Sequence, residues 1–284
     1  MRRLQVEVKT FNSVEIFNKY GIQTKVDNNN MIIISHYCQP NGTTFKELGI
    51  NEDKLIENVI ACEGCFDTRK SELTTLPLIA IKELRLHEDT NIIEAPNLKI
   101  IGTFIPNKKI KKLPKLKKVF NASLEETIIK SLPKLKEANL LIIQNSNIEE
   151  LPALEKVGKL CIIDTPIKDL KNLTEVKEAF ICSTNENEKI ELNILNKLEK
   201  IEKLFVANST LKSMPKLKEA KKIALYNCEI KSIKSSLKAE VEIKTQIADD
   251  ELGEKFDTFT DWYNSEEFNK SLDMLGNITN LIQS

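Results

Sequence analysis

The sequence from Leu132 to Leu170, LPKLKEANLLIIQNSNIEELPALEKVGKLCIIDTPIKDL, contains one pattern twice, 19 residues apart. Its polar positions vary between the two copies, whereas its apolar positions recur at the same spacing. A fixed short period with strict apolar positions indicates one small structural unit per repeat, stacked so that each copy buries the face its neighbour leaves open. The stretch therefore predicts a solenoid. The matching positions are Leu132, Leu135, Ala138, Leu141, Ile143 and Ile148 in the first copy, and Leu151, Leu154, Val157, Leu160, Ile162 and Ile167 in the second.

The same repeat can be followed over residues 56–248 by its strand cores, in which two apolar residues flank a variable one. A period of 19 residues is too short for a strand, two turns and a full helix, which alone needs about 10 to 14 residues. We therefore expect an array dominated by β-structure, with one parallel sheet and extended or 3₁₀ return segments. The predicted cores are Val59–Ala61, Leu84–Leu86, Phe104–Pro106, Ala122–Leu124, Leu141–Ile143, Leu160–Ile162, Ala179–Ile181, Leu204–Val206, Ile223–Leu225 and Val241–Ile243.

One turn can be written L-P-x-L-x-x-V/A-x-x-L-x-I-x-x-S/T-x-I-x-x, which from its seventh position resembles the leucine-rich repeat, and its LP resembles the short bacterial subfamily. The resemblance covers roughly residues 56–245 and implies a single curved array with a concave sheet. Where that family has asparagine, this chain has other small residues. A hydroxyl there can bond the backbone more weakly than an amide, so we expect the fold to persist. The substituted positions are Thr127, Ser146, Thr165, Thr184, Ser209 and Cys228.

The ends of the chain depart from the repeat and are predicted to be caps. Within residues 1–55, LQVEV alternates like a strand, SVEIFNKYG has helical spacing, and IQTKV and MIIIS flank a polar turn, which predicts an α/β N-terminal cap. Residues 249–284 contain nine acidic and two basic residues, a net charge of −7, with apolar residues at helical spacing behind Ser265. They predict an acidic helical C-terminal cap, or alternatively an arm that docks on a partner or on the array.

The composition predicts a cytoplasmic protein that does not enter a membrane. The 284 residues carry 42 basic and 42 acidic side chains, and no apolar run approaches the length of a membrane span. The first residues, MRRLQVEVKTF, lack the apolar core of a signal peptide. Six cysteines scattered among the repeats are too dilute for a disulfide framework, so we expect free thiols.

The positions between and just after the strand leucines should face away from the interior, because side chains alternate along a strand. From Ile142 to Tyr226 these positions are almost wholly apolar, and exposed apolar patches typically mark binding surfaces. We expect the concave face to bind a protein partner or a second copy; the alternative is burial by the C-terminal helix. The predicted partner-binding residues are Ile142, Cys161, Ile163, Phe180, Cys182, Phe205 and Tyr226.

Lysine is the second signal, since residues 95–248 contain 29 lysines, no arginine and 19 acidic residues. A basic patch could bind nucleic acid by counterion release. The absence of arginine and of interleaved aromatic residues argues against this, so nucleic acid is the alternative partner. The candidate contacts are Lys108, Lys109, Lys111, Lys112, Lys115, Lys117 and Lys118.

The cysteines offer one catalytic alternative. Cys62 and Cys65 form a lone CxxC, which is half a zinc site at most, so no metal or other cofactor is predicted. Cys62 and His87 would occupy one column of adjacent turns, and a Cys–His pair is the minimum for thiol catalysis. Without a third group, the sequence favours a non-catalytic binding protein instead. A bacterial or phage inhibitor that blocks another macromolecule is one version of that function which the residues do not establish.

Overall fold

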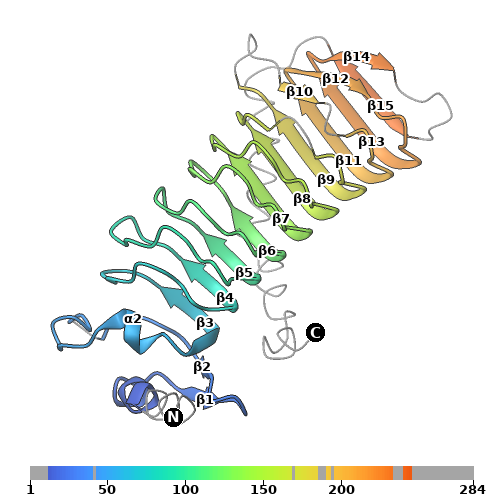
Figure 1. The fold of residues 1–284 in the computed structure, drawn as a ribbon. Helices are drawn as coiled ribbons and strands as arrows, with labels where there is room; N and C mark the ends of the chain where they lie inside the picture. The colour runs from blue at the N-terminus through green and yellow to red at the C-terminus, as the bar shows by residue number, and fades with distance from the viewer. Residues whose placement is uncertain are drawn as a thin grey trace. The chain divides into compact units, whose positions relative to one another are not determined.

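The computed structural model describes residues 12–40, 43–167, 170–184, 190–192, 195–232 and 239–244. They form a β-solenoid whose main strands pair mostly in parallel, as the repeat predicts (Figure 1). The described residues up to Lys117 belong to one compact unit, and those from Lys118 belong to a second. We call these unit 1 and unit 2 and describe each by itself.

The described part of unit 1 begins with a helix over residues 12–19, which ends before Gly21, a glycine with a φ of 78°. The strands β1 (Thr24–Val26) and β2 (Ile32–Ile34) then form an antiparallel hairpin. Its turn is held by Asp27, whose Oδ1 accepts from the amides of Asn29 and Met31, both at 2.8 Å. The helix and both strands predicted here are confirmed, whereas LQVEV lies outside the described residues.

The sheet of unit 1 continues in parallel from β2 to β3 (Val59–Asp67), β4 (Ala80–Arg85) and β5 (Ile100–Ile105). Before β3, the short helix α2 (Glu52–Leu55) begins at Asn51, whose side chain accepts from the amide of Lys54. The buried carboxylate of Glu52 accepts from the hydroxyls of Tyr37 and Ser71, at 2.6 and 3.1 Å. Glu52 thus has the partners that a buried carboxylate needs and stabilises the start of the array.

The predicted register of the first turn is wrong. Phe66, not Val59, stands beside Leu84 of β4, and Cys62 stands beside Ile81, because β3 is irregular between Cys62 and Cys65. Gly64 lies in this bulge, where an added Cβ would clash with the carbonyl oxygen of Ser35. The inward apolar position of this turn is therefore Phe66, and the predicted core Val59–Ala61 belongs to the segment before the repeat comes into register.

The strand repeat is more regular in unit 2 than in unit 1. The main strands of unit 2 all pair in parallel, each with the next main strand along the chain (Figure 1). After the turn, three return segments also pair in parallel as β10 (Ile190–Leu192), β12 (Ser209–Ser213) and β14 (Glu229–Ser232). The expected extended return is thus found in these turns. The main strands are β6 (Lys118–Ser123), β7 (Glu137–Gln144), β8 (Lys156–Ile163), β9 (Glu175–Cys182), β11 (Lys200–Ala207), β13 (Glu219–Tyr226) and β15 (Glu240–Lys244).

The turns that leave these strands explain the missing asparagine column. In five turns of unit 2, the residue that precedes the substituted asparagine position adopts a left-handed backbone conformation, with φ of 46–49°. Four of these five residues are Asn or Asp, the side chains other than glycine that adopt this conformation most readily. The hydroxyl of Ser209 donates to the carbonyl of Ala207 at 2.8 Å, as expected of a substitute for asparagine. The buried hydroxyls of Thr127 and Thr165, however, have no hydrogen-bond partner within the described structure. The ladder of side-chain bonds is therefore incomplete.

Two further expectations concern segments that the structure does not describe. The acidic C-terminal cap predicted over residues 249–284 and most of the polar insertion between Cys182 and Ile190 lie outside the described residues. In the part of the chain that the structure describes, no helix is long and apolar enough to cross a membrane.

Candidate functional site

The outer face of the unit 2 sheet carries the apolar residues that the sequence singled out. This face is the side of the main strands that points away from the interior leucines. Register places Ile142, Cys161, Phe180 and Phe205 side by side on β7, β8, β9 and β11, so the predicted partner-binding residues are brought together. We call the whole cluster the apolar strip. It consists of Leu140, Ile142, Cys161, Ile163, Phe180, Cys182, Phe205, Ala207, Ala224 and Tyr226.

Three aromatic rings lie at the centre of the apolar strip. The rings of Phe180 and Phe205 are stacked, with centroids 4.7 Å apart and planes 2° from parallel. The ring of Tyr226, from the next strand and the next outward position, lies 4.9 Å from that of Phe205 at an angle of 31°. Phe205 therefore contacts a ring on either side, an arrangement that contributes about 0.5–1.5 kcal/mol per pair beyond the area buried.

The apolar strip is buried, although its side chains point away from the interior. Cys161 is 0% exposed and Cys182 and Tyr226 are 1% exposed, and only Phe205 within the strip is half-buried. The expected outward orientation is thus found, but the expected open apolar patch is not. The sequence left two alternatives for these side chains, an exposed binding surface or burial within the chain. Every member of the strip except Phe205 is buried.

Burial also makes the two outer-face thiols inert. Removal from water raises the pKa of Cys161 to about 12, and the same cause raises the pKa of Cys182 to about 12. A thiol with such a pKa is almost entirely protonated at neutral pH, and the thiolate is the reactive form. These cysteines therefore act as small apolar groups in the packing of the strip.

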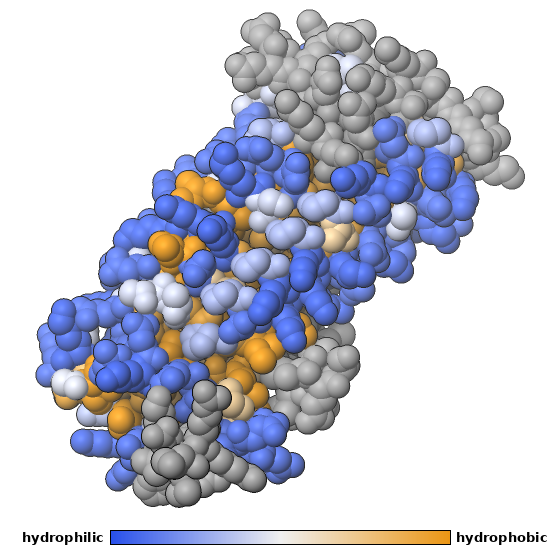
Figure 2. Space-filling model, viewed as in Figure 1, coloured by the Kyte–Doolittle hydropathy of each residue, from blue (hydrophilic) through white to orange (hydrophobic). Residues whose placement is uncertain are grey.

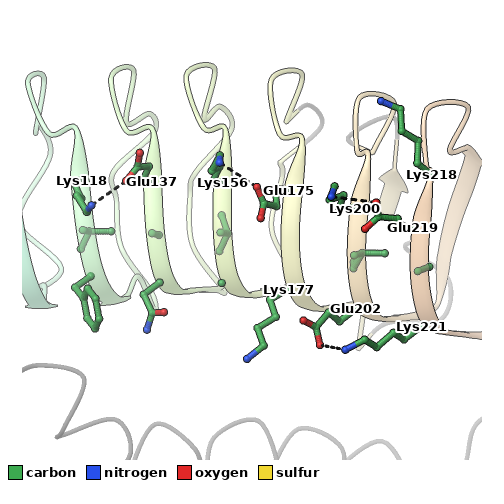
Figure 3. A pocket seen from close by; sticks show the side chains of 18 residues that line it. Lys118, Glu137, Lys156, Glu175, Lys177, Lys200, Glu202, Lys218, Glu219 and Lys221 are labelled. Carbon is green, nitrogen blue, oxygen red and sulfur yellow. Dashed lines mark hydrogen bonds and ion pairs between the residues drawn. The ribbon is translucent and has the colours of Figure 1, made fainter. Parts of the chain in front are cut away.

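A groove follows the amino-terminal ends of the same strands and has a volume of about 980 Å³. Its side chains alternate in sign from strand to strand, as Figure 3 shows. Opposite charges form three ion pairs across neighbouring strands, each 3.0 or 3.1 Å long. We call this column the charge ladder; its pairs are Lys118–Glu137, Lys156–Glu175 and Lys200–Glu219.

The charge ladder was missed by sequence reasoning, although its signal is present. In a parallel solenoid each residue stands beside the residue one repeat later, so a Lys and a Glu 19 residues apart will pair. A count of lysines does not contain this spacing between lysine and glutamate. The same rule gives further pairs outside the groove's main column, namely Lys136–Glu155, Lys130–Glu149, Lys218–Glu199 and Lys221–Glu202.

The predicted lysine corner is mostly exposed, and hydrophilic side chains cover much of the surface in view (Figure 2). Two of its lysines reach local acceptors: Lys109 Nζ donates to the carbonyl of Thr90 at 3.0 Å, and Lys115 Nζ to Asn97 at 2.9 Å. Lys118 belongs to unit 2 and pairs with Glu137 in the charge ladder. The exposed lysines of the corner in unit 1 are Lys108, Lys111, Lys112, Lys115 and Lys117.

The predicted adjacency of Cys62 and His87 is wrong, because the first-turn register is shifted. Cys62 stands beside Ile81 and is 0% exposed, and burial raises its pKa to about 12. His87 follows the end of β4, where its Nε2 lies 3.8 Å from Oδ1 of Asp67. The other cysteine of the CxxC, Cys65, is half-buried and has its pKa raised to about 11 by burial. No nucleophile–base pair is formed between Cys62 and His87.

Metal ligands and relatives give no further lead. Within the described ranges, no three His, Cys, Asp or Glu side chains are grouped so that they could hold a metal ion. Comparison of the chain with protein-family models, curated proteins and solved structures gives no match. The function must therefore be argued from the surfaces of the solenoid.

Proposed function

We propose that this protein is a non-catalytic binding module that engages another protein through the apolar strip of unit 2. The observation that carries this proposal is the stack of Phe180, Phe205 and Tyr226 on the outer face of the sheet. Aromatic residues at the centre of a surface typically dominate the binding energy of protein interfaces. The strip is separate from the interior of the solenoid, which is filled by another set of leucines and isoleucines.

The strip suits a steric mechanism. Its strands are fixed by parallel pairing on both sides, so a partner would bind a preordered surface and lose little conformational entropy on the solenoid's side. Phe205 is the member that remains half-buried, which makes it the first anchor that a partner can reach. We place this function in the cytoplasm and propose that blocking the partner is its purpose, as in a bacterial or phage inhibitor.

The repeat itself favours a binding function. We propose that it is a leucine-rich repeat of the short type, with small hydroxyl residues replacing asparagine, supported by the recurring strand columns and by the left-handed residue in five turns of unit 2. Arrays of this kind build extended surfaces from successive strands. The position that varies most between turns is then the one that selects the partner.

The two alternatives are less well supported. Nucleic-acid binding would rest on the exposed lysines of the unit 1 corner, which are accompanied by no arginine, and many lysines of unit 2 are paired with glutamate within the sheet. Cysteine catalysis would need an accessible thiolate, and Cys62 is buried with a pKa of about 12. We therefore propose neither a nucleic-acid interface nor an active site.

The test is capture of a partner from the source cell by tagged wild-type protein, with quantitative mass spectrometry. Phe205→Glu should remove the captured protein, because a carboxylate cannot occupy an apolar interface without a large desolvation cost. The matched control is Ile105→Glu, which places the same charge at an outward position of unit 1 that is 37% exposed. It should leave capture unchanged.

Both variants must elute as single species and show the wild-type circular dichroism spectrum. The proposal fails if the two substitutions reduce capture equally, or if wild type enriches no protein over an untagged control. Direct binding of the purified partner, measured by titration calorimetry with the two variants, would then give the affinity that Phe205 supplies.

A further inference from the structure

We propose that a lysine patch on unit 1 binds an acidic segment of another polypeptide. The patch lies on the segments that connect β4 to β5 and β5 to β6. It is separate from the apolar strip, which belongs to unit 2, so this inference goes beyond the binding function above and does not depend on it. The patch consists of five exposed residues, Lys99, Lys111, Lys112, Lys115 and Lys117.

The first argument is that these lysines have no carboxylate partners. In the described part of the chain, none of the five forms an ion pair with a carboxylate, and Lys115 Nζ donates instead to Oδ1 of Asn97 at 2.9 Å. One acidic residue, Glu94, stands beside Lys112 in register. Five lysines and one glutamate leave a net charge of +4 on a protein whose total charge is zero. The surplus is therefore local and does not follow from the composition.

The second argument is that two of the lysines stand side by side. The amide of Lys117 donates to the carbonyl of Lys99 at 2.8 Å, which places these residues next to each other in adjacent turns. Like charges directly opposite each other lower stability. In unit 2 the amide of Lys218 donates to the carbonyl of Glu199 in the same way, at 2.8 Å, but there the side chains form an ion pair 2.7 Å long. The repeat can thus neutralise this position, and unit 1 leaves it charged.

The third argument concerns the class of partner. Arginine makes bidentate contacts with phosphate, and residues 95–248 contain none. Nucleic-acid bases stack on aromatic side chains, but the single aromatic residue in the sequence from 91 to 117 is Phe104, which is buried. Ile93, by contrast, is 48% exposed, and its carbonyl accepts from the amide of Lys111 at 2.8 Å. Lysines beside an exposed apolar side chain suit a polypeptide that carries both carboxylates and apolar groups.

The repulsion within the patch gives the proposal a distinctive consequence. Two adjacent like charges destabilise the free protein, and an acidic partner would relieve that repulsion on binding. Reversing one of the charges should therefore raise stability and weaken binding at the same time. A lysine that serves only the fold would not show these opposite effects.

The first experiment measures the binding of a defined probe to the purified full chain. The probe is a fluorescein-labelled peptide of repeated Glu-Glu-Leu, and binding is followed by fluorescence anisotropy at low salt. Lys99→Gln with Lys117→Gln should weaken binding by about fivefold or more, because two unpaired charges are lost. The matched control is Lys218→Gln with Lys221→Gln, which removes two exposed lysines already paired with glutamate. It should change binding by less than about twofold.

Three results would overturn the proposal. The first is an equal loss of binding in the two double variants, and the second is no binding of the peptide by wild type at low salt. The third is tighter binding of a labelled DNA duplex of the same charge, which would assign the patch to nucleic acid. Ile93→Ser should weaken binding of the Glu-Glu-Leu probe while leaving a Glu-Glu-Ser probe and the duplex unchanged.

The second experiment measures thermal unfolding and needs no ligand. Lys117→Glu places a carboxylate beside Lys99, so it should raise the melting temperature at low salt by about 1–2 °C while weakening probe binding. Lys218→Glu is the matched control in unit 2, where it places a carboxylate beside Glu199 and should lower the melting temperature. A fall in both variants would show that Lys117 contributes to the charge balance of the fold, and would overturn the proposal.

The two proposals fail separately. Phe205→Glu should leave binding of the Glu-Glu-Leu probe unchanged, and Lys99→Gln with Lys117→Gln should leave capture through the apolar strip unchanged. If capture fails while probe binding follows the lysine patch, only the function of the apolar strip is excluded. If the probe does not distinguish the two double variants while Phe205→Glu abolishes capture, only the lysine patch is excluded.

Discussion

The outer faces of the two units differ although both are built from the same parallel ladder. In unit 1 the outward positions near the strand centres are polar or exposed: Arg85 pairs with Glu83 at 2.5 Å, and Ile105 is 37% exposed. In unit 2 the equivalent positions carry Phe180 and Phe205, stacked and largely buried. This difference is the reason that we propose the outer face of unit 2 as the binding surface.

The amino-terminal edges of the two sheets show the opposite difference. In unit 1 the position just before the first inward residue is apolar, and Ile33, Ala61 and Ala80 form a small buried cluster. In unit 2 the same position carries the charge ladder, as in the pair Lys156–Glu175. Each unit therefore buries apolar side chains on only one part of its outer face. The inward columns are common to both units, whereas the outward columns differ between them.

The largest effect should come from placing a charge within the apolar strip. Phe180→Glu should lower the free energy of unfolding by about 3 kcal/mol or more, because it buries an unpaired carboxylate and removes a stacked ring. Ile105→Glu, at an exposed outward position of unit 1, should cost less than about 1 kcal/mol. Urea denaturation followed by circular dichroism measures both. Equal costs would show that the two outer faces do not differ in burial.

Much of this difference could be predicted from the sequence, since the outward positions follow from the period once the strand register is known. Ile142, Cys161 and Phe180 lie together as expected because the repeats of unit 2 are nearly uniform in length. The register of the first turn could not be predicted, because the bulge before Cys65 depends on how closely Gly64 approaches Ser35, a contact that no spacing rule contains.

The burial of the apolar strip could not be predicted, for a different reason. The repeat period and the alternation of side chains along a strand predict the direction in which a side chain points. They do not predict which other residues cover it. Cys161 and Ile105 both follow the outward pattern, yet one is 0% and the other 37% exposed. Exposure depends on contacts between segments far apart in the sequence, which no local pattern encodes. The charge ladder, by contrast, follows from the spacing of pairs such as Lys156 and Glu175 along the sequence.

The second effect is a loss of stability at high pH. Burial raises the pKa of Cys62, Cys161 and Cys182 from 9.0 to about 12. Above pH 9 these thiols lose protons in the unfolded chain but keep them in the folded protein, so the free energy of unfolding falls as pH rises from about 9 towards about 12. Denaturation at about pH 8, 9 and 10 should show the decline.

Variants separate the contributions of the two units to this decline. Cys161→Ala with Cys182→Ala should flatten the pH dependence about twice as much as Cys62→Ala, because two buried thiols are removed instead of one. If the double variant keeps the wild-type slope, the outer-face thiols are not buried in solution and the contrast between the units disappears.

The third effect concerns the lysines, which are exposed in the corner of unit 1 and paired in the charge ladder of unit 2. We expect only weak binding to duplex DNA, in the range of about 10⁻⁴–10⁻⁶ M typical of non-specific contacts, and steep loss with salt. Lys111→Gln with Lys112→Gln should weaken this binding several-fold. Lys156→Gln with Lys200→Gln should change it less, because their charges are already balanced by Glu175 and Glu219.

Fluorescence anisotropy with a labelled duplex at two salt concentrations measures these affinities. Nanomolar binding that survives physiological salt would contradict the expectation and favour the nucleic-acid alternative. Equal losses in the two variants would show that ladder lysines remain available to phosphates despite their glutamate partners.

The smallest effect should come from the charge ladder itself. Lys156→Glu would put three acidic side chains side by side with Glu137 and Glu175, and should lower the free energy of unfolding by about 0.5–1 kcal/mol at low salt. The control is Lys134→Glu, which makes the same change of charge at an exposed lysine of a return segment. Both variants change net charge equally, so only the ladder contact distinguishes them.

Salt provides the decisive comparison for the charge ladder, because its ion pairs are about half-exposed and are screened over a Debye length of about 10 Å at 0.1 M. The deficit of Lys156→Glu relative to Lys134→Glu should therefore shrink as sodium chloride is raised from about 20 mM to about 1 M. A deficit that persists at high salt would mean that Lys156 stabilises unit 2 through the packing of its methylene groups instead. The charge alternation along this edge would then follow from composition and not from pairing.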